Sequence, residues 1–182
     1  TLESKPILEE KIEKKETPSW VSTGSGVSVS DNHESKDAFF GVGEKKYIES
    51  PDKVQMDADD AARNSLIRVL GDFNKGLMRY HQAVKDPREP GWLDEEKLKT
   101  VINDTAATLL LDAKIVDHWN QSDSSTSFSL ARLDFKKVQT AFASNNHLNR
   151  NEKTSMTFIS KWVFKNMQLQ KERKLLFKKV SE

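Results

Sequence analysis

Residues 39–84 read FFGVGEKKYIESPDKVQMDADDAARNSLIRVLGDFNKGLMRYHQAV, and two apolar periodicities meet in them. Apolar residues alternate with glycine and polar residues in Phe39–Ile48, which predicts a β-strand. Ser50 and Pro51 follow where a helix can begin, because serine is a frequent N-cap and proline suits the first helical position. The stretch therefore predicts a strand followed directly by one helix that ends near Val84.

The predicted helix carries an apolar stripe along its length. At about 100° per residue, the stripe occupies an arc of roughly 100°, the width of a core-facing surface. It consists of Ala62, Leu66, Val69, Leu70, Phe73, Leu77, Tyr80 and Val84. We expect solvent exposure for Asp60, Asn64, Arg68, Lys75 and Arg79. At about 1.5 Å per residue the helix is on the order of 45–50 Å long, so one end should overhang a small sheet and meet another helix or subunit.

Two interpretations fit Gly41 and Gly43 in the strand. Glycine lets another backbone approach closely, or marks a bulge, where a helix covers a sheet. A phosphate-cradling loop is the alternative, but the motif lacks a third glycine and a strand-to-helix turn directly after it. We therefore expect close packing rather than nucleotide binding.

A second helix follows a proline-containing loop at 86–91. Asp94 can cap this helix, and Leu93 can pack against Leu98 in its first turns. The helix should end near 111–112.

Period-2 alternation recurs in residues 113–120 and 126–134 and predicts a β-hairpin joined through 121–125. Such a hairpin should have one buried and one more polar face, as in an antiparallel sheet.

The last part of the chain predicts a short helix and a long one. Asp134 can cap the short helix, which residues 144–147 interrupt. Asn149 and Glu152 have capping-box spacing, so the long helix should start at Arg150. Its apolar face is wide, which suggests contact with the core and with a tail or partner chain. That face includes Ile159, Trp162, Val163, Leu169, Leu176 and Val180.

These elements predict an α+β fold. We expect an antiparallel-rich sheet of about three to four strands, packed by two long and two shorter helices. The strand at 39–48 should join the hairpin in one sheet, with the 52–84 helix across one face.

The composition limits the classes of function. The chain has 182 residues, and its 29 Lys and Arg nearly cancel 28 Asp and Glu. A net charge of +1 argues against a whole-protein basic field for nucleic acid. The absence of cysteine removes disulfides, thiolate metal sites and cysteine nucleophiles. No apolar run approaches the ~18–20 residues that cross a bilayer.

Residues 1–18 are dense in Lys and Glu and predict a charged spacer, because they can bury little apolar surface. The spacer is either a solvated tail or a tether between an anchor and the folded part. Pro18–Val21 marks the start of a single domain over 19–182. We expect Trp20 on the rim of that domain and a small-residue loop at 22–30.

No cluster of side chains identifies a chemical reaction. The histidines are His33, His81, His118 and His147. None has the spacing of a zinc motif, so we expect isolated surface or hairpin histidines.

The acidic and serine-rich segments carry no reaction motif either. Asp57, Asp59 and Asp60 resemble part of a calcium loop, but the loop glycine and the distal glutamate are missing. The helix dipole explains acidic residues near a helix start. The serines of 122–127 lie outside a GxSxG motif. We therefore assign no catalytic, metal or cofactor-binding residue and predict a protein without enzymatic activity.

The basic C-terminal end is the candidate interaction surface. It comprises Lys171, Arg173, Lys174, Leu175, Phe177 and Lys178. Such a segment could rest on an anionic membrane or polyanion. We favour the other interpretation, a solvated helix face whose Leu and Phe side chains pack on the domain.

Several local motifs resemble a family of small bacterial envelope lipoproteins typified by the Helicobacter low-molecular-weight membrane-associated lipoprotein. They are Pro18-Ser19-Trp20-Val21, Phe40-Gly41-Val42-Gly43, Ala58 through Leu66 with Ala62-Arg63, Val116 through Trp119, and Phe128 through Leu133. The likeness covers roughly Pro18 to Phe142. Two departures are Ser19, where the family usually has an acid, and the long basic final helix.

The resemblance implies a lipid-anchored, periplasm-facing or surface-exposed interaction domain of the bacterial cell envelope. It brings no catalytic residue and no cofactor. The expected partners are envelope proteins, a second copy of the chain, and the membrane through a lipid anchor. We expect a hydrophobic signal and a lipid-modified Cys to be encoded upstream of Thr1.

Three functional hypotheses remain. The chain is a protein-binding envelope domain, a polyanion- or peptidoglycan-associated regulator that uses the basic helix, or an enzyme of unrecognised type. The first is preferred, with neither nucleic acid nor a small-molecule substrate as ligand.

Overall fold

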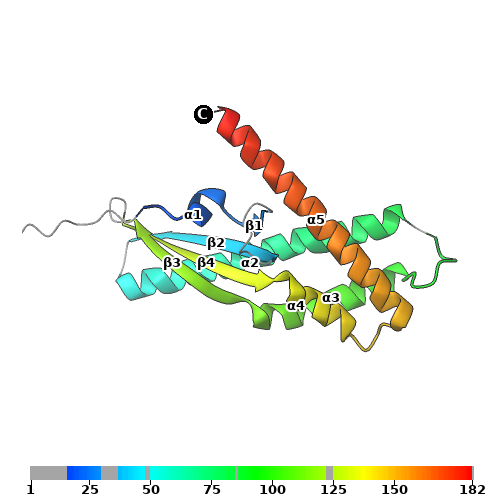
Figure 1. Ribbon diagram of the computed structural model, residues 1–182. Coiled ribbons are helices and arrows are strands. Elements are labelled where there is room, and N and C mark those ends of the chain that lie inside the picture. Colours follow the sequence, from blue (N-terminus) through cyan, green and yellow to red (C-terminus); the bar gives the residue numbers. More distant parts are fainter. Residues whose placement is uncertain (1–15, 30–36, 48–49, 85, 122–124, 182) are drawn as a thin grey trace, which may run out of the picture.

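The computed structural model describes residues 16–29, 37–47, 50–84, 86–121 and 125–181. They form an antiparallel sheet and helices, which confirms the predicted α+β fold (Figure 1). The described strands are β1 (Gly26–Val27), β2 (Ala38–Lys46), β3 (Lys114–Gln121) and β4 (Thr126–Asp134). The described helices are α1 (Ser19–Thr23), α2 (Pro51–Ala83), α3 (Glu95–Asp112), α4 (Phe135–Ala143) and α5 (Arg150–Ser181).

The four described strands lie in the order β1-β2-β4-β3, and all neighbours are antiparallel. The predicted hairpin is therefore confirmed, and so is its union with the 39–48 strand through β2 and β4. Strand β1 lies in the stretch that the sequence predicts as a loop. Two residues are too few to show a period-2 pattern, so this prediction was wrong. The predicted spacer is described only from residue 16, and the boundaries at 18 and 19 stay predictions.

Helix α2 packs directly on one face of the sheet at the two strand glycines. A β-carbon at Gly41 would overlap the carbonyl oxygen of Ala62, and one at Gly43 would overlap that of Ala58. Ala58 and Ala62 are fully buried. Small residues on both elements thus let two backbones meet. The predicted close approach is confirmed, since backbone atoms of α2 fill the space beside both glycines.

The apolar stripe of α2 forms the centre of the core. All its predicted members are buried except Tyr80, which is half-buried, and Val84, which is 54% exposed. Val84 was wrongly predicted because the helix already ends at Ala83. Phe73 packs edge-on against Phe39 of β2, with ring centroids 5.2 Å apart.

Strand β4 is buried on both faces, which contradicts the predicted polar face of the hairpin. It lies inside the sheet between β2 and β3. Its Ser127 and Ser129 face α2, while Phe128 and Leu130 face the other way. On the second face the ring of Phe128 packs against that of Trp119 of β3, with centroids 5.4 Å apart. Trp20 Nε1 of α1 donates to Asp117 Oδ2 of β3 at 2.9 Å. A strand covered on both faces cannot show the alternation of a half-exposed one.

Two predicted helix caps are confirmed. The Lys97 backbone N–H donates to the Asp94 carboxylate at 2.8 Å. The Asn149 and Glu152 pair forms a full capping box, with backbone-to-side-chain distances of 2.8 and 3.0 Å. Lys97 Nζ also lies 2.7 Å from Glu152 Oε1 and links the starts of α3 and α5.

Two other predicted caps were wrong. Ser50 and Asp134 occupy N-cap positions, but neither side chain accepts a capping hydrogen bond. The Asp134 carboxylate instead accepts from Arg132 Nε at 2.7 Å.

Helix α5 crosses α2 and then leaves the domain, so that its C-terminal part projects beyond the sheet (Figure 1). Ile159 and Val163 are buried as predicted. The other predicted members of its apolar face are exposed, namely Trp162, Leu169, Leu176 and Val180. That part of the prediction was wrong, because the crossing presents the opposite side of the helix to the domain.

Candidate binding groove

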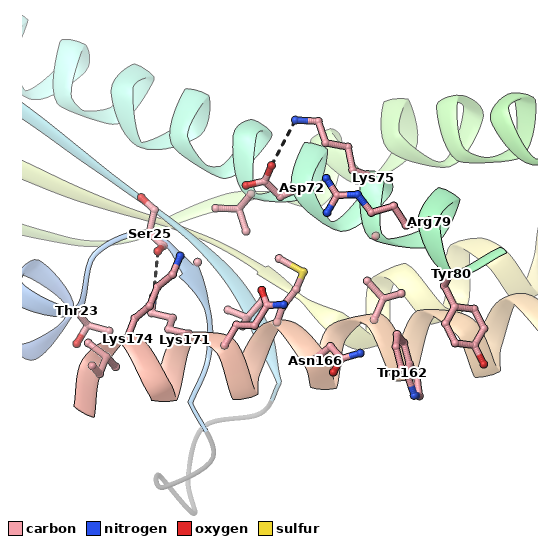
Figure 2. A pocket seen from close by; sticks show the side chains of 18 of the residues that line it. Thr23, Ser25, Asp72, Lys75, Arg79, Tyr80, Trp162, Asn166, Lys171 and Lys174 are labelled. Atoms are coloured by element: carbon pink, nitrogen blue, oxygen red, sulfur yellow. Dashed lines mark hydrogen bonds and ion pairs between the residues drawn. The ribbon is translucent and has the colours of Figure 1, made fainter. Parts of the chain in front are cut away.

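Helices α2 and α5 meet at a glycine. A β-carbon at Gly76 would overlap Cγ1 of Val163, so the two helices pack tightly there. Beside this contact, α2, α5 and residues 23–27 enclose an open groove of about 710 Å³ (Figure 2). The helix crossing thus creates a concave surface from segments far apart in the sequence.

Four cationic side chains line the groove. Lys75 and Arg79 come from α2, and Lys171 and Lys174 come from α5. Asp72 is the one acidic lining residue in the described part of the chain, and its Oδ1 is 3.5 Å from Lys75 Nζ. Asp72 offsets one of these four charges, so the lining keeps an excess of positive charge. The groove therefore favours negatively charged ligands.

Lys171 has a second role as a tie between α5 and the segment before β1. Its Nζ donates to the carbonyl oxygens of Gly24 at 3.1 Å and Ser25 at 3.0 Å. Burial lowers the pKa of Lys171 to about 8. Gln168, one turn earlier, reinforces the tie by donating to the Ser28 carbonyl oxygen at 3.0 Å.

The floor of the groove is apolar. Val27 and Val163 are buried there, and Met167 is partly buried against the core. At one end the rings of Tyr80 and Trp162 lie 4.5 Å apart between centroids. A ligand for this groove should therefore combine negative charge with apolar groups.

The structure divides the predicted interaction residues into two sets. Lys171, Lys174 and Leu175 line the groove. Arg173, Phe177 and Lys178 lie on α5 outside it and are exposed. We favoured packing of the Leu and Phe side chains on the domain, and this is wrong for Leu176 and Phe177, which are 63% and 74% exposed. The physical reason is the projection of α5, which takes this part of the helix away from the other elements.

The α2 half of the groove was missed from sequence. Lys75 and Arg79 were correctly predicted to be exposed, but only as solvated residues. The spacing of Asp72, Lys75 and Arg79 places them along one helix face. Nothing local indicates that the basic part of α5 lies opposite that face.

A second polar cluster joins α2 to the hairpin. Ser129 Oγ donates to Asp59 Oδ1 at 2.6 Å, and His118 Nε2 lies 2.8 Å from the same oxygen. Gln55 Nε2 donates to Ser129 Oγ at 2.8 Å. Burial raises the pKa of Asp59, but hydrogen bonds from Ser129, His118 and Gln55 outweigh it and lower the pKa below its ordinary value. The helix dipole therefore does not account for Asp59, which bonds to the sheet.

This cluster contains Ser, His and Asp in the wrong order for a hydrolase. In a catalytic triad the imidazole takes the proton of the serine hydroxyl and the carboxylate orients the imidazole. Here the carboxylate of Asp59 contacts both other groups, and Ser129 is fully buried. The cluster satisfies buried polar groups between helix and sheet, which is a structural role.

No group of three or more potential metal ligands occurs within the described residues. Asp57 and Asp60 point to separate partners, Lys45 at 3.4 Å and Arg63 at 3.1 Å, rather than to a shared centre. His81 is buried beside Trp92, with ring centroids 6.0 Å apart. It corrects the expectation of surface or hairpin histidines, because its position one turn after Leu77 belongs to the core side of α2.

His147 is exposed, as predicted, and its Nε2 lies 3.7 Å from Asp104 Oδ2. His33 and part of the serine-rich 122–127 segment lie outside the described residues.

The chain matches no protein-family model and no curated protein. In the described part of the chain, helices long and apolar enough to span a bilayer are absent.

Proposed function

We propose that this chain is a non-catalytic binding domain that holds an acidic, partly apolar segment of a partner protein in the groove between α2 and α5. The observation that carries the proposal is the convergence of Lys75, Arg79 and Lys174 on one groove from two helices. No ion pair among the described residues involves Arg79 or Lys174. These two charges are available to a ligand.

A protein segment fits the groove better than a uniform polyanion does. The buried floor formed by Val27 and Val163 offers apolar contact, which a sugar-phosphate or polyglutamate chain cannot use. Asp72 lies on the α2 wall beside Lys75 and would repel a continuous row of negative charges. A peptide can place an apolar or neutral side chain opposite this carboxylate.

The cellular setting of the proposal comes from the resemblance to envelope lipoproteins. We place the domain in the bacterial cell envelope, held to a membrane by a lipid anchor, with other envelope proteins as partners. Fatty-acid labelling of the product of the complete gene tests this setting. A product that takes up no label would remove the lipid anchor but would leave the groove proposal intact.

The groove is tested with a library of fluorescent peptides in which Asp and Glu alternate with Leu and Phe. We expect salt-sensitive binding that weakens about tenfold or more when Arg79→Glu is combined with Lys174→Glu. Arg68→Glu is the matched control, because Arg68 is an exposed α2 cation outside the groove lining. It should bind as the wild type does.

Two results would overturn the proposal. One is undiminished peptide binding by the Arg79→Glu, Lys174→Glu protein. The other is tighter binding of polyglutamate than of the mixed peptides, which would favour the polyanion-associated regulator.

A further inference from the structure

A second apolar surface runs along the outer side of α5, away from the groove floor. Its members are spaced by four, seven, seven and four residues, which keeps them within an arc of roughly 40° on a helix. They are Phe158, Trp162, Leu169, Leu176 and Val180, between 42% and 85% exposed. We call this set the outer stripe. The buried Ser160 and Val163 lie on the other side of the helix. Trp162, near the base of the outer stripe, packs on Tyr80 at the end of the groove, and the stripe faces away from the domain beyond it.

Cations border the outer stripe. Lys161, Lys165, Arg173 and Lys179 are all exposed on its two sides. Glu172 is the acidic residue of α5 on this face, and it is half-buried. At the base of the stripe, Phe158 shares a small cavity with Asp86 and Glu89, so the outer part of the stripe is the more basic part. The surface is therefore complementary to negative charge.

The outer stripe is unsuited to a coiled coil with another helix. Trp162, Leu169 and Leu176 recur every seven residues, as one apolar position of a heptad does. The positions three residues further on, which would form the other half of the seam, hold Lys165, Glu172 and Lys179. Half of the knobs-into-holes layers would thus be charged. Self-pairing would also bring the bordering cations of two copies together.

We propose that the outer stripe of α5 lies on the surface of an anionic lipid bilayer. Aromatic and aliphatic side chains of a surface helix enter the boundary between headgroups and acyl chains, and lysines beside them extend toward the phosphates. The outer stripe has this composition, and the projection of α5 places its outer part beyond the sheet, where a flat surface can reach it (Figure 1). The helix lies on the membrane and does not cross it.

Vesicle binding of the full chain tests this assignment. Vesicles of phosphatidylcholine with phosphatidylglycerol should bind at least about tenfold more tightly than phosphatidylcholine vesicles, and salt should weaken the binding. Trp162 fluorescence should shift to shorter wavelength on binding, and Trp162→Phe should remove most of that shift. Leu176→Ser combined with Val180→Ser should weaken binding by about tenfold or more.

Matched variants separate this surface from the groove. Leu111→Ser is the apolar control, since Leu111 is 86% exposed at the end of α3 and Val180 is 85% exposed. Both Leu111→Ser and the groove variant Arg79→Glu should bind vesicles as the wild type does. Circular dichroism should show unchanged folding, because the substituted side chains are exposed.

The assignment is wrong if the mixed vesicles are not bound, or if the Leu176→Ser, Val180→Ser protein binds them as tightly as the wild type. It is also wrong if sedimentation shows a dimer that this double variant abolishes while vesicle binding is weak. The outer stripe would then be a contact between two copies of the chain. Peptide binding in the groove would be unaffected by any of these results.

Discussion

Gly41→Ala should destabilise the protein strongly, although it adds a single methyl group. The new β-carbon would overlap the Ala62 carbonyl oxygen and lie 2.8 Å from Leu66 Cα. Carbon atoms in ordinary contact are about 3.5–4.0 Å apart, so α2 would have to retreat by about 1 Å. The obstacle is helix backbone, which cannot rotate away as a side chain can. We expect a loss of about 3 kcal/mol, at the upper end of the usual range for overpacking.

Urea unfolding followed by circular dichroism measures this loss. With an unchanged m-value, the midpoint should fall by about 1–2 M. Gly71→Ala is the matched control, because a β-carbon at Gly71 in α2 would meet nothing within 4 Å. In a helix interior this change should stabilise the protein by about 0.5–1 kcal/mol.

The comparison tests whether α2 lies on β2 as closely as described. The same substitution, Gly→Ala, should lower the free energy of unfolding at Gly41 and raise it at Gly71. Stability equal to that of the wild type in Gly41→Ala, or equal gains at both positions, would refute the reasoning.

Three further predictions concern the core, acid stability and the groove. Leu66→Ala or Phe73→Ala should each lower the free energy of unfolding by about 2–5 kcal/mol, while exposed Arg68→Ala should change it by less than about 0.5 kcal/mol; urea melts in the reverse order would mean that the wrong face of α2 is assigned to the core. Burial raises the pKa of Asp59, but the hydrogen bonds to its carboxylate lower it by more. The pKa in the folded protein is therefore below the ordinary value of 3.8. Ionised Asp59 therefore stabilises the fold above about pH 4, and this contribution disappears as the pH falls through the folded pKa. Urea melts of Asp59→Asn should show a flatter loss of stability in acid, and a slope like that of the wild type would contradict this. Because burial lowers the pKa of Lys171 to about 8, acidic peptides should bind the groove less tightly above that pH. The Lys171→Arg protein should bind the same peptides equally well on both sides of pH 8. Binding titrations that show no difference between the two proteins would mean that the Lys171 charge does not act on the ligand.

Local signals predicted most of the fold. The stripe of α2 follows from spacing alone, and the Asn149 and Glu152 capping box is a contact between residues three positions apart. The role of Gly41 was also accessible, because glycine in a strand beside a helix indicates close approach. Each of these features depends on residues that are near one another in the sequence.

Burial of the β4 serines could not be predicted in the same way. Ser127 and Ser129 look like the polar face of a hairpin, yet both are buried. Ser127 bonds to Gln55, and Ser129 bonds to Asp59, at sequence separations of 72 and 70 residues. Polar residues can enter a core only with such partners, and a single sequence does not identify the partners.

The two sides of α5 show a different limit. Apolar residues occur all around this helix, so spacing cannot tell Val163, which packs on the domain, from Leu176, which does not. The angle at which α5 crosses α2 decides between them. At this crossing Gly76 meets Val163, a pair that no local pattern connects.

The tie between α5 and the β1 segment has a consequence for the order of folding. Gln168 and Lys171 hold Ser28 and Gly24 across 140 and 147 residues of chain. During synthesis from the N-terminus, β1 therefore cannot form these hydrogen bonds until Gln168 and Lys171 have left the ribosome. Contacts of such long range slow the search for the native state. We expect nascent chains that stop before Gln168 to leave their first described residues open to proteases, even where β2, α2 and the hairpin have already assembled.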